Sequence, residues 1–380
     1  MPEKLNLETL LVSGISPEVH SEPVVSPIIL STTFERGSDG NFVPGGDIYS
    51  RSSNPNRRQL EKKLALLENG LKALAFSSGQ AATYAVFQAL PAGSHVIIPD
   101  DIYYGTRSAL KLLGNNTGIT LSEINMADIE EVDSSILPET RLIWVETPSN
   151  PKLKITDIDA ILKLSKKHKN ILVACDNTWA TPYFSKPLDL GCDLVMHSTT
   201  KYFGGHSDVV GGALMWKEEK DETFFAKIKE YQITGGAVPS PFDCWLLNRS
   251  LATFHLRMPR HAENAMGLAG YLESHPKILQ VFYPGLKSNE GHKIAQKQMV
   301  NGFGGMLSVL IEGDEENCKA VAARLKVFKN ATSLGGVESL VDHRRTYEGK
   351  DSTLPANLLR VSVGIENLQD LIADFKQALG

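Results

Sequence analysis

The sequence is poor in cysteine, and its few cysteines lack the spacing of a metal site or a disulfide framework. The 380 residues include only four, which are Cys175, Cys192, Cys244 and Cys318. No two of them form a Cys-x-x-Cys pair, and none has a histidine at zinc-ligand spacing. The composition therefore excludes a disulfide scaffold, and we expect reduced thiols, no metal site and a cytoplasmic protein.

Long apolar runs and an excess of positive charge are also missing. No run approaches the ~18 apolar residues of a membrane span. Met1–Lys4 resembles the start of neither a secretory signal nor a transit peptide. Because 39 Lys and Arg residues stand against 44 Asp and Glu residues, the formal net charge is −5. We therefore expect binding to neither membranes nor nucleic acid.

What is present is the composition of a folded protein with more than one unit. Hydrophobic residues make up 42% and charged residues 22% of the chain. Residues 1–48 stand apart because they contain four prolines, Pro17, Pro23, Pro27 and Pro44. Proline interrupts regular ladders, so this segment cannot bury a core alone. We expect an arm that lies on something larger, such as a partner subunit.

Residues 49–241 alternate between short apolar runs and amphipathic segments. Predicted strands are Ala73–Ser77, His95–Ile98, Ile119–Ile124, Arg141–Glu146, Ile171–Asp176, Asp193–His197 and Gly212–Trp216. Predicted helices include Arg57–Asn69, Ala81–Leu90 and Thr156–His168, the last with Thr156 as its N-cap. This alternation predicts an α/β fold with a mostly parallel sheet covered on both faces.

Residues 242–380 show a different pattern, typical of a smaller α+β domain. A long helix is predicted from Phe242 to Leu272, and a final helix from Leu368 to Leu379. Strands are predicted at Val281–Tyr283, Met306–Ile311 and Leu358–Val363.

Two polar clusters follow predicted strands where parallel sheets bind ligands. Ser77-Ser78-Gly79-Gln80 precedes a helix, and its N–H groups could hold a phosphate, although such a turn is a common helix start. Asp176 ends an apolar run. A carboxylate there needs a cationic partner, or else it caps a helix together with Asn177 and Thr178.

Two further clusters carry cations. Lys201 follows Ser198 and Thr200 and precedes a glycine pair, so it could form an imine with a carbonyl rather than remain a solvated charge. Arg360 lies among apolar residues, where it either binds a carboxylate in a cleft or faces water from an edge strand.

One cofactor needs all of these groups. Pyridoxal 5′-phosphate (PLP) requires an anion cradle, an acid facing its ring nitrogen, a lysine for its aldehyde and an aromatic stacking partner. Asp176 and Lys201 supply the acid and the amine. Tyr103, just after the strand at His95–Ile98, could stack on the ring, or simply pack between loop and sheet.

Several motifs resemble those of the Cys/Met-metabolism family of PLP enzymes, over nearly the whole chain. The family includes cystathionine γ-synthase, cystathionine γ-lyase, cystathionine β-lyase, methionine γ-lyase and O-acylhomoserine sulfhydrylases. The motifs are Tyr49-Ser50-Arg51 with Asn54-Pro55, Glu146 to Pro151, Asp193 to Asp208, Pro239 to Asp243, Ser333 to Leu340 and Arg360 to Glu366. The resemblance implies the PLP-dependent transferase fold type I, like that of aspartate aminotransferase.

The resemblance also implies roles for individual residues. Lys201 would be the imine-forming lysine and proton shuttle, Asp176 the partner of the pyridine nitrogen, and Tyr103 the stacking ring. Phosphate ligands would be Gly79, Gln80, Ser198 and Thr200, joined by Tyr49 and Arg51 of a neighbouring subunit. Asn150, Ser333 and Arg360 would surround the substrate α-carboxylate and the ring oxygen. The assembly would be a homotetramer, a dimer of dimers with shared active sites.

Specificity is harder to infer, because the chain departs from the family pattern beside the expected substrate side chain. His343–Gly349 replaces the common His-Pro-Ala-x-Met-Thr-His stretch, Tyr104 stands where a glycine is usual, and Gln80 where a methionine is usual. We expect a transsulfuration enzyme that handles cystathionine, with Glu338 slightly favouring γ-chemistry. β-Cleavage, methionine γ-cleavage, acylhomoserine sulfhydrylation and transamination remain alternatives.

Overall fold

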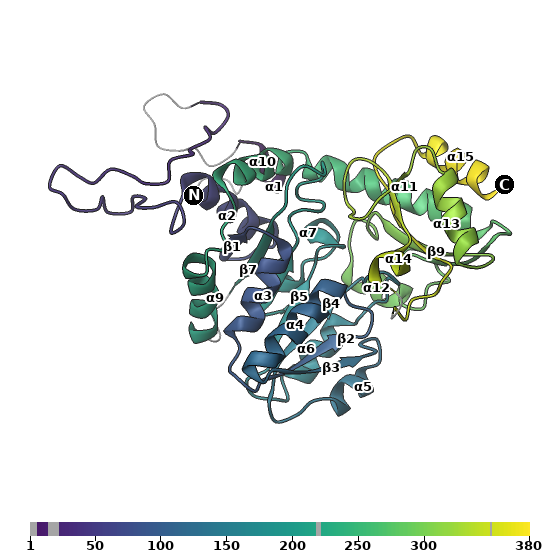
Figure 1. Cartoon of the computed structure of the whole chain (residues 1–380), viewed down its shortest axis with the longest axis horizontal. Coiled ribbons are helices and arrows are strands. Elements are labelled where there is room, and N and C mark those ends of the chain that lie inside the picture. The colour runs from purple at the N-terminus through teal and green to yellow at the C-terminus, as the bar shows by residue number, and fades with distance from the viewer. Residues whose placement is uncertain (1–5, 14–22, 218–221, 350–351) are drawn as a thin grey trace.

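The computed structural model describes residues 6–13, 23–217, 222–349 and 352–380. Met1–Lys4 and Pro17 therefore lie outside the described residues, and the expected arm is described only in part. Two β-sheets organise the rest of the chain (Figure 1). No helix within the described ranges is long and apolar enough to cross a membrane.

The larger sheet has seven strands in the order β1-β7-β6-β5-β4-β2-β3. Their bounds are β1 (Lys72–Phe76), β2 (His95–Pro99), β3 (Thr120–Ile124), β4 (Thr140–Glu146), β5 (Leu172–Asp176), β6 (Leu194–His197) and β7 (Gly212–Trp216). Strands β3, β2, β4, β5 and β6 pair in parallel, while β7 runs antiparallel to both β6 and β1. The expectation of a mostly parallel sheet agrees with this arrangement.

Helices cover both faces of this sheet. The helices before β8 are α1 (Leu7–Ser13), α2 (Pro55–Leu67), α3 (Gly79–Ala89), α4 (Tyr104–Thr117), α5 (Ile129–Ser134), α6 (Ile158–Ser165), α7 (Thr181–Phe184), α8 (Pro187–Leu190), α9 (Glu222–Thr234), α10 (Pro241–Leu251) and α11 (Phe254–Glu273). Successive side chains of β4 point to opposite faces. Trp144 accordingly packs in the core with α3, α4 and α9, whereas Ile143 and Val145 pack with α5 and α6.

The smaller sheet has five strands in the order β10-β11-β12-β9-β8. Their bounds are β8 (Ile278–Phe282), β9 (Met306–Ile311), β10 (Lys329–Asn330), β11 (Leu340–Asp342) and β12 (Leu358–Ser362). The remaining helices are α12 (His292–Gln298), α13 (Glu315–Arg324), α14 (Arg344–Glu348) and α15 (Leu368–Leu379). Helix α11 leads from the larger sheet to the smaller one (Figure 1). A domain boundary at residues 241 and 242 stays a prediction.

The predicted helix from Phe242 to Leu272 is wrong as a single element, because α10 ends at Leu251 and α11 begins at Phe254. The buried Arg257 side chain donates from Nη2 to the Ser250 carbonyl at 3.1 Å and from Nη1 to Tyr202 O at 2.8 Å. The Ser250 carbonyl therefore accepts from the Arg257 side chain and from the N–H and hydroxyl of Thr253 instead of from an N–H four residues later, and the chain can turn there.

The predicted N-cap at Thr156 is also wrong by one residue. Asp157 caps α6, since its Oδ1 accepts from the Ala160 N–H at 3.1 Å. The Thr156 N–H instead donates to Thr147 Oγ1 at 3.1 Å, and its carbonyl accepts from Gln298. Tertiary partners thus occupy the backbone groups of Thr156, and the next acid caps the helix.

Candidate active site

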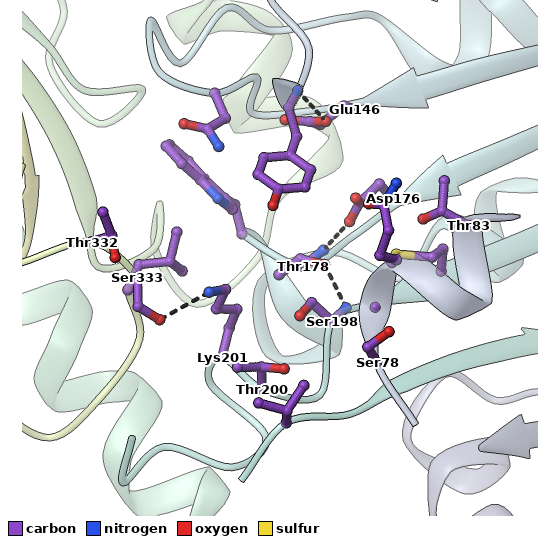
Figure 2. A pocket seen from close by; sticks show the side chains of 18 of the residues that line it. Ser78, Thr83, Glu146, Asp176, Thr178, Ser198, Thr200, Lys201, Thr332 and Ser333 are labelled. Atoms are coloured by element: carbon purple, nitrogen blue, oxygen red, sulfur yellow. Dashed lines mark hydrogen bonds between the residues drawn. The ribbon is translucent and has the colours of Figure 1, made fainter. Parts of the chain in front are cut away.

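The carboxyl ends of the parallel strands open onto a cavity of about 310 Å³ (Figure 2). Such a volume suits a small-molecule ligand. The predicted residues that line it are Gly79, Gln80, Tyr103, Asn150, Asp176, Ser198, Thr200, Lys201, Ser333 and Arg360. The structure therefore places Asp176 and Lys201, which follow strands of the larger sheet, in one cavity with Ser333 and Arg360. The latter two lie more than a hundred positions later in the chain.

Lys201 enters the cavity from the turn after β6. Its Nζ donates to Ser333 Oγ at 2.9 Å (Figure 2). Burial, together with the charges of Arg360 and Arg344, lowers the pKa of Lys201 to about 8. The neutral amine, the form that attacks carbonyls and accepts protons, is therefore more populated near neutral pH than it is for an ordinary lysine, although the ammonium still predominates there.

The start of α3 forms a concave surface at one end of the cavity. Ser78 caps the helix, because its Oγ accepts from the Ala81 N–H at 3.0 Å. The N–H groups of Gly79 and Gln80 belong to the first turn, which has no intrahelical acceptors. A Cβ at Gly79 would lie 2.9 Å from both Cβ and Oγ of Ser198. Only a glycine therefore allows the helix start and Ser198 to approach this closely.

Ser198 and Thr200 bring hydroxyl groups to the same end. The Ser198 N–H donates to Thr178 Oγ1 at 2.9 Å, which orients the Ser198 backbone (Figure 2). The Thr200 hydroxyl donates to the Gly211 carbonyl at 3.2 Å and accepts from the Gly211 N–H at 3.0 Å. The Thr200 hydroxyl is thus hydrogen-bonded to the backbone of Gly211, while Ser198 Oγ lies beside Gly79 at the start of α3.

Asp176 ends β5 with its carboxyl group buried at the cavity wall. The Thr178 N–H donates to Asp176 Oδ1 at 3.0 Å (Figure 2). Burial raises the pKa of Asp176, and the hydrogen bonds from Thr178 partly oppose that rise. A buried carboxylate in this position is stabilised by a cationic donor from a ligand.

Glu146 lies directly beside Asp176, because the two residues are register partners in β4 and β5. Burial and then the charge of Asp176 raise the pKa of Glu146 well above that of an ordinary carboxyl group. Two buried acids side by side cannot both ionise cheaply, and the charge of each disfavours ionisation of the other.

Tyr103 stands at the start of α4 and partly covers the cavity. Its N–H donates to Glu146 Oε2 at 3.1 Å, and 40% of its surface remains exposed. A Cβ at Gly105 would lie 2.4 Å from Tyr103 Cε1. Tyr104 stands directly after Tyr103, where the family pattern has a glycine. In this chain Gly105, one position later, is the glycine that packs against the Tyr103 ring. Gln80 Nε2 donates to the Gly105 carbonyl at 2.6 Å and ties α4 to α3.

Arg360 joins three segments at the far side of the cavity. Its Nη1 donates to Asn150 Oδ1 at 3.2 Å, and its Nη2 donates to the Ser333 carbonyl and to Asp342 Oδ2, both at 3.0 Å. Burial and then the charge of Arg344 lower the pKa of Arg360 to about 10. Ser333 has a φ of 87°, a strained value for serine, which these contacts help to maintain.

Tyr49 and Arg51 are not among the residues that line this cavity. Arg51 Nη1 donates to the Ile233 carbonyl at 2.8 Å, and its guanidinium lies over the Tyr49 ring. Glu338, which the sequence linked to γ-chemistry, does not line the cavity either. It accepts a hydrogen bond from Ser207.

Among the residues of the cavity wall that sequence reasoning did not assign to the site are Glu146, Thr178, Arg344 and Tyr347. The signal for Glu146 was its place in the motif from Glu146 to Pro151. The signal for Thr178 was its position two residues after Asp176. Arg344 and Tyr347 belong to the stretch His343–Gly349, whose unusual sequence was the signal that could have found them.

These residues fit PLP as a ligand. The close approach that Gly79 permits leaves room for an anion among N–H and hydroxyl donors. Asp176 brings a buried carboxyl group to the cavity wall, where it could accept from a ring N–H. Lys201 offers a desolvated amine to an aldehyde. No cluster of possible metal ligands occurs within the described ranges.

Comparisons with known proteins give the same answer. A cystathionine gamma-synthase of Mycobacterium tuberculosis is 46% identical over 374 residues, covering 97% of this chain and 95% of that protein. A cystathionine gamma-lyase of Dictyostelium discoideum is 41% identical, covering 97% and 95%. The crystal structure of metB from Corynebacterium glutamicum superposes with a TM-score of 0.94 at 40% identity, covering 100% and 99%.

The similarity confirms the expected fold type, cofactor and enzyme class. Residues 8–380 match the family model described as Cys/Met metabolism PLP-dependent enzyme. With geometry and similarity in agreement over nearly its full length, the chain belongs to this family of PLP-dependent enzymes of cysteine and methionine metabolism.

Proposed function

We propose that the protein is a cystathionine γ-synthase-like transsulfuration enzyme, which replaces the γ-substituent of an activated homoserine by the sulfur of cysteine. The observation that carries the proposal is the desolvated Lys201 amine, which donates to Ser333 in the cavity that Asp176 also lines. The 46% identity to a cystathionine gamma-synthase over 97% of the chain supports this reaction over its relatives.

Substrate orientation falls to Arg360. Its planar guanidinium can donate two parallel hydrogen bonds to the two oxygens of an α-carboxylate. Its hydrogen bonds to Asn150 and Asp342 hold the guanidinium in one orientation. Lys201 and Arg360 both donate to Ser333, so an amino acid bound by Arg360 would have its α-carbon close to the Lys201 amine. Asn150, Ser333 and Arg360 thus act as one support for the amino-acid end of the substrate.

Proton handling falls to Lys201. PLP, when bound, supplies an electrophilic aldehyde and a ring that accepts electron density, while Asp176 holds the charge at its ring nitrogen. Lys201 Nζ takes the proton from Cα of the substrate and a second proton from Cβ, which γ-chemistry requires. The hydroxyl of Ser333 keeps the amine within this part of the cavity.

The balance of the overall reaction is simple. The Cγ–O bond of the homoserine ester breaks, a Cγ–S bond to cysteine forms, and the thiol proton leaves with the released acid. No net oxidation or reduction occurs, so no redox partner is required.

Cystathionine γ-cleavage is the second candidate, favoured by the 41% identity to a cystathionine gamma-lyase. The same Lys201 proton transfers serve either direction, because both break or form a bond at Cγ. β-Cleavage would require only the proton from Cα.

The test is a product analysis with the PLP-loaded protein. Incubation of O-succinyl-L-homoserine or O-acetyl-L-homoserine with cysteine should yield cystathionine, and Lys201→Ala should abolish it. Incubation with cystathionine alone reports on cleavage, because cysteine with 2-oxobutanoate marks the γ-bond and homocysteine with pyruvate marks the β-bond. The proposal is wrong if β-cleavage is the main reaction, or if no sulfur substrate reacts.

We also propose a homotetramer built from dimers with shared active sites, working in the cytoplasm. Residues 23–48 expose apolar side chains such as Val24, Leu30 and Phe42, and they extend away from the body of the chain (Figure 1). A partner's cavity would receive Tyr49 and Arg51, since their own chain's cavity does not. The four cysteines are all buried, and reduced thiols suit a reducing compartment.

A further inference from the structure

A buried acid outside the cavity has no part in the reaction as described so far. Asp101 follows β2, is only 6% exposed, and does not line the cavity. Burial raises the pKa of Asp101, and hydrogen bonds from Ser149 and Lys152 oppose that rise. A buried carboxyl group is costly unless donors compensate it, so the segment that supplies these donors is held against it.

The donors come from the loop after β4, which carries Asn150. Asp101 Oδ2 accepts from Ser149 Oγ at 2.6 Å and from the Lys152 N–H at 2.9 Å. Ser149 Oγ in turn accepts from the Lys154 N–H at 2.9 Å, and the Ser149 N–H donates to the Lys154 carbonyl at 3.0 Å. Asp101 therefore fastens both arms of this loop to the end of β2.

The smaller sheet holds the same loop from the other side. Ser308 on β9 is buried, and its Oγ donates to the Pro151 carbonyl at 2.7 Å. Arg360 is the register partner of Ser308 on β12, and its Nη1 donates to Asn150 Oδ1 at 3.2 Å. The residue before Asn150 is thus held by the loop after β2, and the residue after it by the smaller sheet.

The Asn150 carboxamide depends on this support, because it meets Arg360 through one hydrogen bond at the long end of the ordinary range. A small displacement of the loop would lengthen that contact beyond a hydrogen bond. The guanidinium would then lose one of the three acceptors that orient it, which are Asn150, Ser333 and Asp342.

We propose that Asp101 is a positioning residue for the substrate α-carboxylate, because it fixes the loop on which Asn150 orients Arg360. The proposal rests on the proposed function, which assigns the α-carboxylate to Arg360. Neither Asp101 nor Ser149 lines the cavity, so both act without touching the substrate.

The decisive measurement compares two ligands that differ only in the carboxylate. L-Norvaline has the group that Arg360 is proposed to bind, and n-butylamine is the same molecule without it. Titration of each into the PLP-loaded protein, followed by cofactor absorbance, gives two dissociation constants. The native protein should bind norvaline about tenfold or more tightly than butylamine, the effect of one charge-assisted hydrogen bond.

Variants assign this preference to the buried acid. Asp101→Ala should weaken norvaline binding about fivefold or more and leave butylamine within about twofold, since only norvaline uses the guanidinium. Ser149→Ala removes the linking hydroxyl and should give the same pattern. Asp100→Ala is the matched control, because Asp100 is the neighbouring acid, does not line the cavity, and forms an exposed ion pair with Lys154 of the same loop.

The route through Asn150 has its own test. In an Asn150→Ala background, Asp101→Ala should weaken norvaline binding by less than about twofold further, because the acceptor that Asp101 positions is already gone. A loss as large as in the native background would show that Asp101 acts by another route and would refute the inference.

The other outcomes are equally defined. Equal losses of norvaline and butylamine in Asp101→Ala would mark a general loosening of the site and refute the inference, as would the same loss of norvaline in Asp100→Ala. If Asp101→Ala does not fold, Ser149→Ala decides, since unchanged norvaline binding there would refute the route through the loop.

The two proposals can fail separately. Equal binding of norvaline and butylamine by the native protein would refute this inference together with the proposed role of Arg360. Failure of the proposed γ-replacement appears in the product analysis instead, and it leaves the binding constants readable.

Discussion

At the scale of single residues, burial sets the chemistry of the cavity. Lys201 and Asp176 occur at strand ends, as their sequence positions indicate, but their altered pKa values arise from desolvation and from neighbours distant in sequence. Arg360 depresses the pKa of Lys201, and Glu146 shares a buried wall with Asp176. The residue types were readable from the sequence, whereas their protonation states depend on the fold.

Lys201 provides a pH-dependent prediction. Its lowered pKa of about 8 means that the neutral amine predominates above that pH and the ammonium below it. The rate at which cofactor-free protein takes up PLP, measured by its visible absorbance band, should therefore rise with pH and level off above about 8. A rate that keeps rising toward pH 10, as an ordinary lysine would give, contradicts this prediction.

Asp176→Asn tests the proposed contact between this acid and the nitrogen of the cofactor ring. The amide keeps the shape and the Thr178 contact but removes the charge. Turnover should fall roughly 10- to 150-fold, the range of a charge-assisted hydrogen bond, with folding retained. Asp100→Asn is the control, because Asp100 forms an exposed ion pair with Lys154 outside the cavity. Equal turnover of both variants in steady-state assays would reject the role of Asp176.

At the scale of elements, the start of α3 is placed by contacts that its own sequence does not contain. Ser78 and Gly79 are ordinary helix-start residues, and their value as an anion cradle comes from Ser198 against them. The strand β7 reinforces this packing, since a Cβ at Gly212 would lie 2.2 Å from the Ser78 carbonyl. Two strands and one helix therefore determine the geometry of the cradle together.

Gly79→Ala should disturb that cradle. The added Cβ, 2.9 Å from Ser198, must push the helix start and the strand loop apart. Overpacking of this kind costs about 1–3 kcal/mol, so the affinity for PLP should fall about tenfold, measured by equilibrium titration.

Gly270→Ala is the matched control for the cradle. No atom lies within 4 Å of its added Cβ, and Gly270 occupies the interior of α11. Alanine there should raise the free energy of unfolding by roughly 0.5–1 kcal/mol and leave PLP affinity unchanged. Equal PLP affinity in both variants would show that close packing at Gly79 does not shape the phosphate site.

At the scale of the whole molecule, the cavity belongs to both sheets. The larger sheet supplies Lys201 and Asp176, while Ser333, Arg344 and Arg360 come from the segment that carries the smaller sheet. Arg51 lies outside its own chain's cavity, which leads to the proposal of a shared site. Movement of one unit relative to the other would separate the amine from its substrate support.

Mixed subunits test the shared site directly. Arg51→Ala and Lys201→Ala chains should each be inactive or nearly so as homo-oligomers, because each removes one part from every site. A mixed oligomer contains some sites with both native residues, so activity should return when the two are refolded together. Recovery no greater than the sum of the separate variants would count against a site built from two chains.

The alternation of apolar runs and amphipathic segments determined most of the larger sheet, because strand and helix periodicity is a local property of the chain. The prediction that Asp176, at the end of β5, and Lys201, after β6, lie in one cavity followed from a general rule. Parallel strands place their carboxyl ends at the same edge of a sheet, where ligands bind. The break between α10 and α11 could not be predicted in this way, because Arg257 satisfies a carbonyl from a later turn.

By itself the sequence determined the α/β class, the PLP-binding residue types and their placement at strand ends. Only the tertiary structure decided that Arg344 shares the cavity with Lys201, that Glu146 is buried beside Asp176, and that Arg51 lies outside its own chain's cavity. The physical reason is that secondary structure depends on near neighbours, whereas desolvation and charge depend on which distant segments the packed core brings together.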